Sequence, residues 1–298
     1  MKTMKKILCV LLAVLTVCFG FAACSSSSDN TADSSDTAAE ETAKVKVIDI
    51  DLTEEEYAFG VDKDQPDLLK STNDFIAKIQ GDGTFDAICN KYFGDGTPEA
   101  VTSAKEDSTK DQLVVATNAA FEPFEYTQGD SYYGIDMEIA KLLADELGKE
   151  LVIKNMDFDS VCLSVGQHKA DIAMAGLTVK PDREEYVTFS TSYYTASQRI
   201  IVTGDNTEFD ACKTADEVVA ILNAKDKAST KIGVQNGTTA QFYVEGDAEW
   251  GFDGVPAQCV GYKNGSLAVQ DLINGNLNYV IIDSAPASCI TDAINAVA

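Results

Sequence analysis

Positive charge is scarce in this 298-residue sequence, which contains 23 Lys and Arg residues but 48 Asp and Glu residues. The formal net charge is −25 at pH 7. Nucleic acids and anionic membrane surfaces are bound through basic surfaces that attract phosphate groups. The composition therefore argues against nucleic acid as a partner and favours a protein that stays soluble outside the cell.

Histidine is almost absent, since His168 is the only one. It follows Gly166 and Gln167 at a predicted turn, where we expect a solvated side chain. The sequence also has no nucleophile-histidine-acid set, no P-loop, no HExxH motif and no CxxC pair. These motifs are typical of nucleophilic catalysis, phosphate binding and metal binding. The sequence therefore predicts no catalytic residues, no metal site and no cofactor.

The N-terminal stretch has the pattern of an export signal. Lysines precede an apolar run at residues 7–21, which is too short to span a membrane comfortably. The following sequence FAAC, residues 21–24, is similar to a bacterial lipobox with Phe in place of the usual Leu. We predict a signal peptide over residues 1–23 and lipidation of Cys24, with simple secretion as the alternative. Residues 24–43 are rich in Ser, Thr, Ala and acid, which predicts a disordered tether.

Five further cysteines have spacings that fit neither a metal site nor a disulfide-dense miniprotein. Because their number is odd, at least one thiol is free or pairs between molecules, and the pairing stays open. Two of them fall in amphipathic helical patterns and are expected to be small core residues. The five are Cys89, Cys162, Cys212, Cys259 and Cys289.

A possible carboxylate receptor lies at the end of a predicted buried strand. Residues 172–175 form a short apolar run that ends at Gly176. Thr178 then offers a hydroxyl, and Arg183 offers a planar guanidinium whose parallel N–H donors fit a carboxylate. The alternative is that Arg183 only forms a surface ion pair with a neighbouring glutamate.

A second stretch has the same build and the opposite charge. Residues 267–273 read as a helix that stops at 274–276, and residues 279–282 read as a buried strand that ends in Asp283. One unit ends near a cation and the other ends in a carboxylate. This pattern suggests two α/β lobes that face each other. A site that binds an α-amino acid needs a cation for its carboxylate and an anion for its ammonium group.

Several motifs together resemble a known family. They are GLTVKPDR with VTFSTSYY, LVVATNAAFEPFEY (113–126), IGVQNGTTAQFYVE (232–245) and YVIIDSAPA (279–287). The chain, from about Val45 on, is similar to the polar amino-acid family of extracellular solute-binding proteins that feed ABC importers. The resemblance implies a two-lobed, hinged α/β fold of the type II periplasmic-binding-protein class. It also implies a monomer that works with a permease at the extracellular face of the cell membrane, anchored through Cys24, or in the periplasm.

The order of the motifs differs from the family. The run from LTEEEYAFGV to CNKYFG, residues 52–94, lies at the C-terminal end of family members but comes first here. Joining Ala298 to Lys44 restores the family order, which predicts a circular permutant whose residues 95–111 link the old ends. A truncated tandem fusion is the alternative.

The predicted permutation sets the domain map. Lobe 1 is expected over residues 57–194, including the linker at 95–111, and lobe 2 over 44–56 plus 195–298. The hinge strands are expected near 53–57 and 193–197. The pattern also predicts strands at 45–51 and 57–61 and helices at 66–81 and about 85–93.

The resemblance and the charges together suggest roles for the site residues. Arg183 should bind the ligand carboxylate, helped by the Thr178 hydroxyl and by backbone groups at Gly176. Asp283 should bind the α-ammonium group. Further donors are expected from the backbone N–H groups of Thr238 and Thr239, where a helix opens.

The remaining site residues would contact the ligand side chain. Phe121 and Phe158 match family positions whose rings sandwich that side chain, and the alternative is that they are core residues. Asn118 and Gln235 stand where some relatives place an acid and a lysine, so the pocket offers amides instead of charge. This favours a neutral polar L-amino acid such as glutamine, with cystine as another candidate.

Two other classes of function are weighed against transport. Cyclohexadienyl or arogenate dehydratases use the same fold, and fold alone does not decide function. A receptor sensing module would need a membrane span after the signal, which the sequence lacks. The export signal and the zwitterion set favour a non-enzymatic binding protein.

Overall fold

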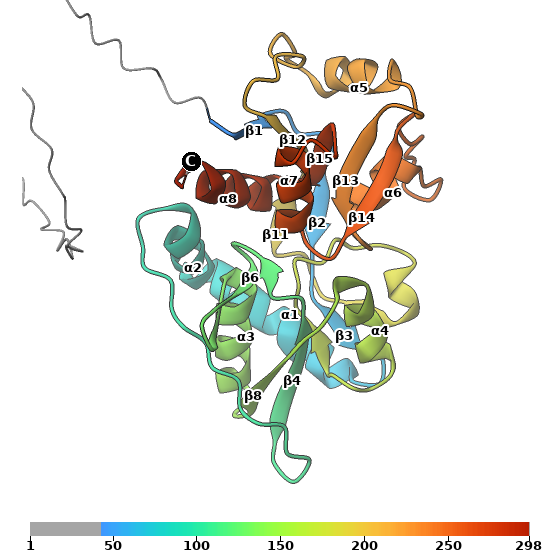
Figure 1. Ribbon diagram of the computed structural model, residues 1–298. Coiled ribbons are helices and arrows are strands. Elements are labelled where there is room, and N and C mark those ends of the chain that lie inside the picture. The colour runs from blue at the N-terminus through green and yellow to red at the C-terminus, as the bar shows by residue number, and fades with distance from the viewer. Residues whose placement is uncertain (1–42, 298) are drawn as a thin grey trace, which may run out of the picture. The chain divides into compact units, whose positions relative to one another are not determined.

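The computed structural model describes residues 43–297 (Figure 1). The predicted signal peptide, Cys24 and the tether up to residue 42 lie outside the described residues. Within residues 43–297, no helix combines the length and the apolar character needed to cross a membrane. All five cysteines of this part of the chain are free thiols. Of the two predicted core cysteines, Cys162 is buried, whereas Cys89 is only partly buried.

One five-stranded sheet has the order β1-β12-β15-β13-β14, and we call this sheet and its helices lobe 2 (Figure 1). The first strand pairs antiparallel with β12, and β13 pairs in parallel with both β14 and β15. The strands are β1 (Val45–Ile48), β12 (Gln198–Thr203), β13 (Lys231–Gln235), β14 (Gln258–Tyr262) and β15 (Tyr279–Asp283). The helices are α5 (Ala215–Asn223), α6 (Thr239–Glu245), α7 (Gly265–Ile273) and α8 (Ser284–Asn295).

A second five-stranded sheet has the order β10-β3-β9-β4-β8, and with its helices it forms lobe 1. Its strands are β3 (Gly60–Asp62), β4 (Gln112–Thr117), β8 (Glu150–Asn155), β9 (Ile172–Ala173) and β10 (Val187–Phe189). Its helices are α1 (Pro66–Gly81), α2 (Thr84–Phe93), α3 (Ile135–Glu146) and α4 (Val161–Gly166), with single turns η1 (Phe158–Ser160) and η2 (Arg183–Glu185). A small sheet of β5 (Ala120–Phe121), β6 (Glu125–Gln128) and β7 (Ser131–Tyr133) lies beside them. The molecule is thus a two-lobed α/β protein.

Two short strands pair where the chain passes between the lobes. β2 (Glu55–Tyr57) lies antiparallel to β11 (Tyr194–Ala196), with Tyr57 opposite Tyr194. The single strand predicted over residues 57–61 is wrong, because β2 pairs with β11 while β3 joins the sheet of lobe 1. Residues 57–61 are all buried, so hydrophobicity alone gives no sign of the break.

The helix predicted at residues 66–81 is confirmed as α1. Pro66 stands in the first turn, where its missing N–H group costs no hydrogen bond. One side of this helix buries Phe75, Ile76 and Ile79 in the core of lobe 1.

The beginning of β1 lies against the end of α8. The side-chain oxygen of Asn295 accepts hydrogen bonds from the backbone N–H groups of Lys44 at 3.0 Å and Val45 at 3.3 Å. Its Nδ2 donates to the carbonyl of Val45 at 2.9 Å. Residues 44 and 295 are therefore neighbours in lobe 2, although they lie 251 positions apart in the sequence.

Candidate functional site

Arg183 stands in the turn after β9 and is 8% exposed. Its Nη1 donates to the carbonyl of Thr178 at 2.7 Å, and its Nη2 donates to the carbonyl of Gly237 at 3.0 Å. The second bond joins lobe 1 to lobe 2. Within the described residues Arg183 forms no ion pair, so the alternative of a surface pair with Glu184 or Glu185 is not realised.

Thr178 lies between Arg183 and an acid that the sequence analysis missed. Its hydroxyl donates to Oε2 of Glu55 at 2.8 Å and receives a 3.3 Å bond from the hydroxyl of Thr239. Glu55 is 3% exposed and stands on β2 between the lobes. A chain of hydrogen bonds thus runs from lobe 2, through Thr178 in lobe 1, to the connecting strand.

Asp283 ends β15 and is 4% exposed. Its Oδ1 accepts a 2.5 Å hydrogen bond from the hydroxyl of Tyr57, whose ring is fully buried. Burial raises the pKa of Asp283 from its usual 3.8 to about 7, and the charge of nearby Glu55 adds to this rise. Two acids are therefore held close together in a desolvated place.

Two of the predicted backbone donors are already engaged. The N–H group of Gly176 donates to Oδ2 of Asp136 at 2.9 Å, in a buried contact. Thr238 bonds back to the carbonyl of Gln235, through its hydroxyl at 2.8 Å and its N–H group at 3.4 Å. The predicted hydroxyl of Thr178 instead faces the hydroxyl of Thr239, for which only the backbone N–H group was predicted as a donor.

The two predicted amide side chains meet between the lobes. Nε2 of Gln235 in lobe 2 donates to Oδ1 of Asn118 in lobe 1 at 3.0 Å, and Nδ2 of Asn118 donates to the carbonyl of Met156 at 2.6 Å. Gln235 is 1% exposed, and among residues 43–297 its Oε1 finds no hydrogen-bond partner. A buried oxygen without a hydrogen-bond partner can accept a hydrogen bond from a ligand.

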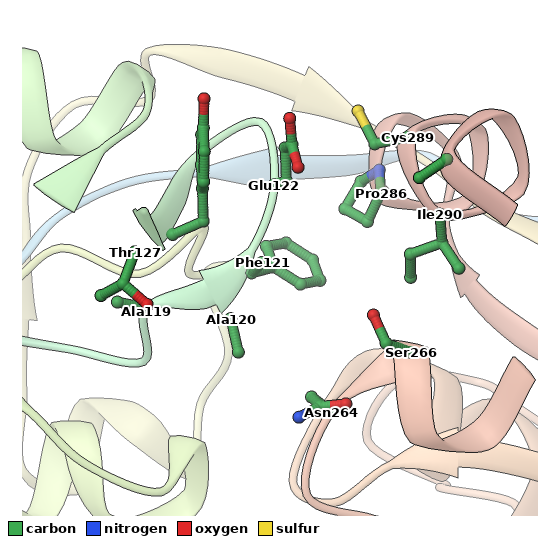
Figure 2. Close-up of a pocket in the computed structure, with 12 residues that line it drawn as sticks. Ala119, Ala120, Phe121, Glu122, Thr127, Asn264, Ser266, Pro286, Cys289 and Ile290 are labelled. Carbon is green, nitrogen blue, oxygen red and sulfur yellow. The ribbon is translucent and has the colours of Figure 1, made fainter. Parts of the chain in front are cut away.

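The two predicted aromatic residues lie on the lobe 1 side. The guanidinium carbon of Arg183 stands 5.2 Å from the centre of the Phe158 ring, which is partly buried. Phe121 is buried and faces a cavity of about 290 Å³ between the lobes. Figure 2 shows Phe121 and Glu122 on one side of this cavity, opposite Asn264, Ser266 and residues of α8. Of the predicted site residues, Phe121 alone lines this cavity, and Arg183 and Asp283 do not.

The only histidine is less isolated than expected. Nδ1 of His168 lies 2.7 Å from Oδ2 of the buried Asp62, and its Nε2 lies 3.7 Å from the exposed Asp64. The hydrogen bond and charge of Asp62 raise the pKa of His168. Ligand atoms of these three residues lie within 4.8 Å of one another, a spacing that could hold a metal ion. His168 remains exposed, as predicted for a turn.

Sequence reasoning missed Glu55, Tyr57 and Gln198. A signal for the first two was present, because Glu55 and Tyr57 alternate with Glu56 on β2, and only Glu56 is exposed. A carboxylate on the buried side of a strand points to a partner or a ligand. No such periodic signal marks Gln198.

Comparison with known proteins agrees with this geometry. The model of the bacterial extracellular solute-binding proteins, family 3, matches residues 113–282, more than half of the chain. The arginine-binding extracellular protein ArtP of Bacillus subtilis is 33% identical over 137 residues, 46% of this chain and 49% of ArtP. A putative ABC transporter arginine-binding protein 2 of Escherichia coli is 31% identical over 172 residues, 57% of this chain and 62% of that protein. The chain thus spans about half of the first relative and less than two thirds of the second.

Solved structures show the same fold. The ancestral amino acid-binding protein AncCDT-1, described as a precursor of cyclohexadienyl dehydratase, matches with a TM-score of 0.52 and 30% identity. The match covers 61% of this chain and 74% of AncCDT-1. The holo arginine-binding protein of T. maritima matches with a TM-score of 0.50 and 28% identity, covering 61% of this chain and 74% of that protein. By its sequence and its two-lobed fold, the chain belongs to the bacterial extracellular solute-binding proteins, family 3.

Proposed function

We propose that this protein is the substrate-binding component of an amino-acid ABC importer and that it holds a neutral polar L-amino acid between its lobes. The observation that carries the proposal is a buried guanidinium and a buried carboxyl group, neither of which has an oppositely charged partner in the described residues. Within the described part of the chain, Arg183 has no carboxylate partner and Asp283 has no cationic partner. An α-amino acid supplies both missing charges.

The energetics favour a zwitterionic ligand. A buried charge without a partner is costly, and removing one member of a buried pair costs about 2 to 5 kcal/mol. Carbonyl groups accept two of the N–H bonds of Arg183 but leave its charge uncompensated. A ligand carboxylate would accept the two parallel N–H bonds that this guanidinium can donate.

The side-chain preference rests on Asn118 and Gln235. These amides carry no net charge, and Oε1 of Gln235 lacks a donor within residues 43–297. A glutamine-like side chain would supply an amide N–H group there, and cystine is the second neutral candidate. Several relatives are named for arginine or histidine, so basic amino acids belong in the test.

The expected setting follows from the family. We propose an extracellular or periplasmic monomer, anchored through Cys24, that presents its lobes to a permease. We also propose the circular permutation, with lobe 1 over residues 57–194 and lobe 2 over 44–56 and 195–298. Two observations support the permutation. The family match begins at residue 113, although β1 and β3, which precede that residue, belong to the two main sheets. In addition, Asn295 contacts Lys44.

We propose that the protein is not an enzyme. The likeness to a precursor of cyclohexadienyl dehydratase makes dehydration the alternative to test, although that precursor is itself described as an amino acid-binding protein. Turnover of prephenate would support the dehydratase reading, and binding without turnover would support transport.

A thermal-shift panel tests the proposed function. The ligands are L-glutamine, L-cystine, L-arginine, L-histidine and prephenate. A ligand at 100 times its dissociation constant stabilises the folded protein by about 2.7 kcal/mol, which raises the unfolding midpoint visibly. We expect the largest rise with L-glutamine or L-cystine. If no amino acid raises the midpoint, the proposed function is wrong; if only a basic amino acid does, the side-chain preference is wrong.

A further inference from the structure

We infer that Glu55 and Gln198 complete the ammonium site of Asp283, and that binding of an amino acid there releases a proton. This inference rests on the proposed function and adds two ligand-binding residues to it. It makes the connecting strand β2 part of the binding site.

The three side chains come from three strands, of which only β12 and β15 are neighbours in one sheet, whereas β2 pairs with β11. Gln198 of β12 stands opposite Asp283 of β15 in the sheet of lobe 2. Its Nε2 donates to Oε1 of Glu55 on β2 at 3.0 Å. Gln198 is fully buried, and the two acids are 3% and 4% exposed. The pairing of β12 with β15 therefore fixes Asp283 beside Gln198, and the side-chain bond holds Glu55 beside the same amide.

This place holds buried acceptors and lacks a cation. Neither Glu55 nor Asp283 forms an ion pair within residues 43–297. In the same part of the chain, Oε1 of Gln198 has no hydrogen-bond partner. An ammonium group has three N–H donors, and this site offers three acceptors in the form of two carboxylates and one amide oxygen.

The groups that face the two acids are neutral or negative. Tyr57 of β2 donates to Asp283, and Thr178 donates to Glu55. The hydroxyl of Thr53, which precedes β2, donates to Oε1 of Glu55 at 2.7 Å. The other titratable groups near Asp283 are Glu125 of β6 and Tyr194 of β11. None of them supplies positive charge.

A proton is the simplest cation that relieves this repulsion in the free protein. Burial, and then the charge of Glu55, raise the pKa of Asp283 to about 7. When an ammonium ligand arrives, its positive charge favours both carboxylates in their ionised form. The protonated Asp283 then loses its proton to solvent, and the ammonium takes the place of that proton beside two carboxylates.

Calorimetry on the wild-type protein tests the proton release without any variant. L-glutamine is titrated in two buffers that differ in ionisation enthalpy, with L-arginine as the probe if glutamine does not bind. Because the pKa of Asp283 is about 7, we expect release of nearly one proton per ligand at pH 6 and of almost none at pH 8. Equal binding enthalpies in the two buffers at pH 6 would overturn the inference.

The variant Glu55→Gln tests the role of the second acid. It keeps the shape of the side chain and an acceptor for Thr178 but removes one negative charge. We expect affinity for the amino acid to fall at least tenfold and proton release at pH 6 to fall below the wild-type value. The matched control is Glu56→Gln, because Glu56 stands on the opposite, exposed side of the same strand. Its affinity should stay within twofold of wild type.

A folded Glu55→Gln protein with wild-type affinity would overturn the inference and leave the proposed function intact. If the variant fails to fold, Gln198→Met takes its place, and undiminished affinity in that variant overturns the inference. If the wild-type protein binds neither probe nor any amino acid of the thermal-shift panel, the proposed function fails and this inference fails with it.

Discussion

The ammonium group of Lys180 lies 2.9 Å from the centre of the Phe242 ring. Lys180 belongs to lobe 1 and is 2% exposed, whereas Phe242 belongs to α6 of lobe 2. The same ammonium lies 3.5 Å from Oδ2 of Asp247, also in lobe 2. These contacts cross between the lobes and depend on the closed arrangement.

Replacing Lys180 should therefore favour opening. We expect Lys180→Met to weaken amino-acid affinity about tenfold, mainly through faster dissociation, because desolvated cation–π and ionic contacts would be lost. Stopped-flow fluorescence measures this rate, and Lys169→Met, on an exposed turn of lobe 1, is the control. An unchanged dissociation rate in Lys180→Met would show that these contacts do not hold the lobes together.

Arg183 should be indispensable for binding. Arg183→Ala removes the guanidinium and should reduce affinity by about 2 to 5 kcal/mol, and Arg183→Lys should recover only part of that loss because an ammonium cannot form the parallel pair of bonds. Isothermal titration measures both variants. Arg199→Ala is the control, since Arg199 pairs with Asp49 and Asp51 in exposed contacts of lobe 2. Near-normal affinity in Arg183→Ala would remove the basis of the proposed carboxylate site.

Glu125 should make stability depend on pH. It is fully buried, and within residues 43–297 neither carboxylate oxygen has a partner. Burial, with the charges of Asp136 and Asp283, raises the pKa of Glu125 well above its usual 4.5. The folded protein thus keeps a proton that the unfolded chain loses, so stability should fall as the pH rises above 4.5.

Urea unfolding between pH 5 and pH 8 measures this dependence. The wild-type protein should be more stable at pH 5, and Glu125→Gln should reduce the slope and add about 1 to 3 kcal/mol at pH 8. The exposed change Glu249→Gln should leave the slope unaltered. A slope that persists unchanged in Glu125→Gln would assign the effect to other acids.

Asn295 should contribute to the stability of lobe 2. It forms three hydrogen bonds with the backbone of Lys44 and Val45, two of which are at least partly buried. We expect Asn295→Ala to lower the free energy of unfolding by about 1 to 2 kcal/mol, because backbone groups at the start of β1 lose their partner. Ser288→Ala, at an exposed bond on the same helix, is the control. Equal stability of the two variants would contradict this role.

Local patterns predicted much of the fold. Pro66 and Gly81 bound α1 because a proline fits a first helical turn and a glycine ends a helical pattern. The buried strand that ends in Asp283 followed from an uninterrupted run of Tyr, Val and Ile. Such features depend on neighbours in the sequence, so the sequence displays them directly.

Contacts between distant segments were beyond local patterns. The hydroxyl of Thr178 was predicted to bind the ligand, but it donates to Glu55, which lies 123 positions away in the sequence. Lys180 of lobe 1 likewise contacts the ring of Phe242 and the carboxylate of Asp247, which both belong to lobe 2. Pairings of this kind depend on how β2 and β11 bring the lobes together, which no periodicity reveals.

The bond from Arg183 to the carbonyl of Gly237 has a kinetic consequence. It spans the two lobes, so the lobes can separate to admit a ligand only after this bond has broken. Ligand capture is then an exchange of partners that follows opening. At high ligand concentration the observed association rate should level off at the opening rate, since extra ligand cannot hasten a step that precedes its arrival.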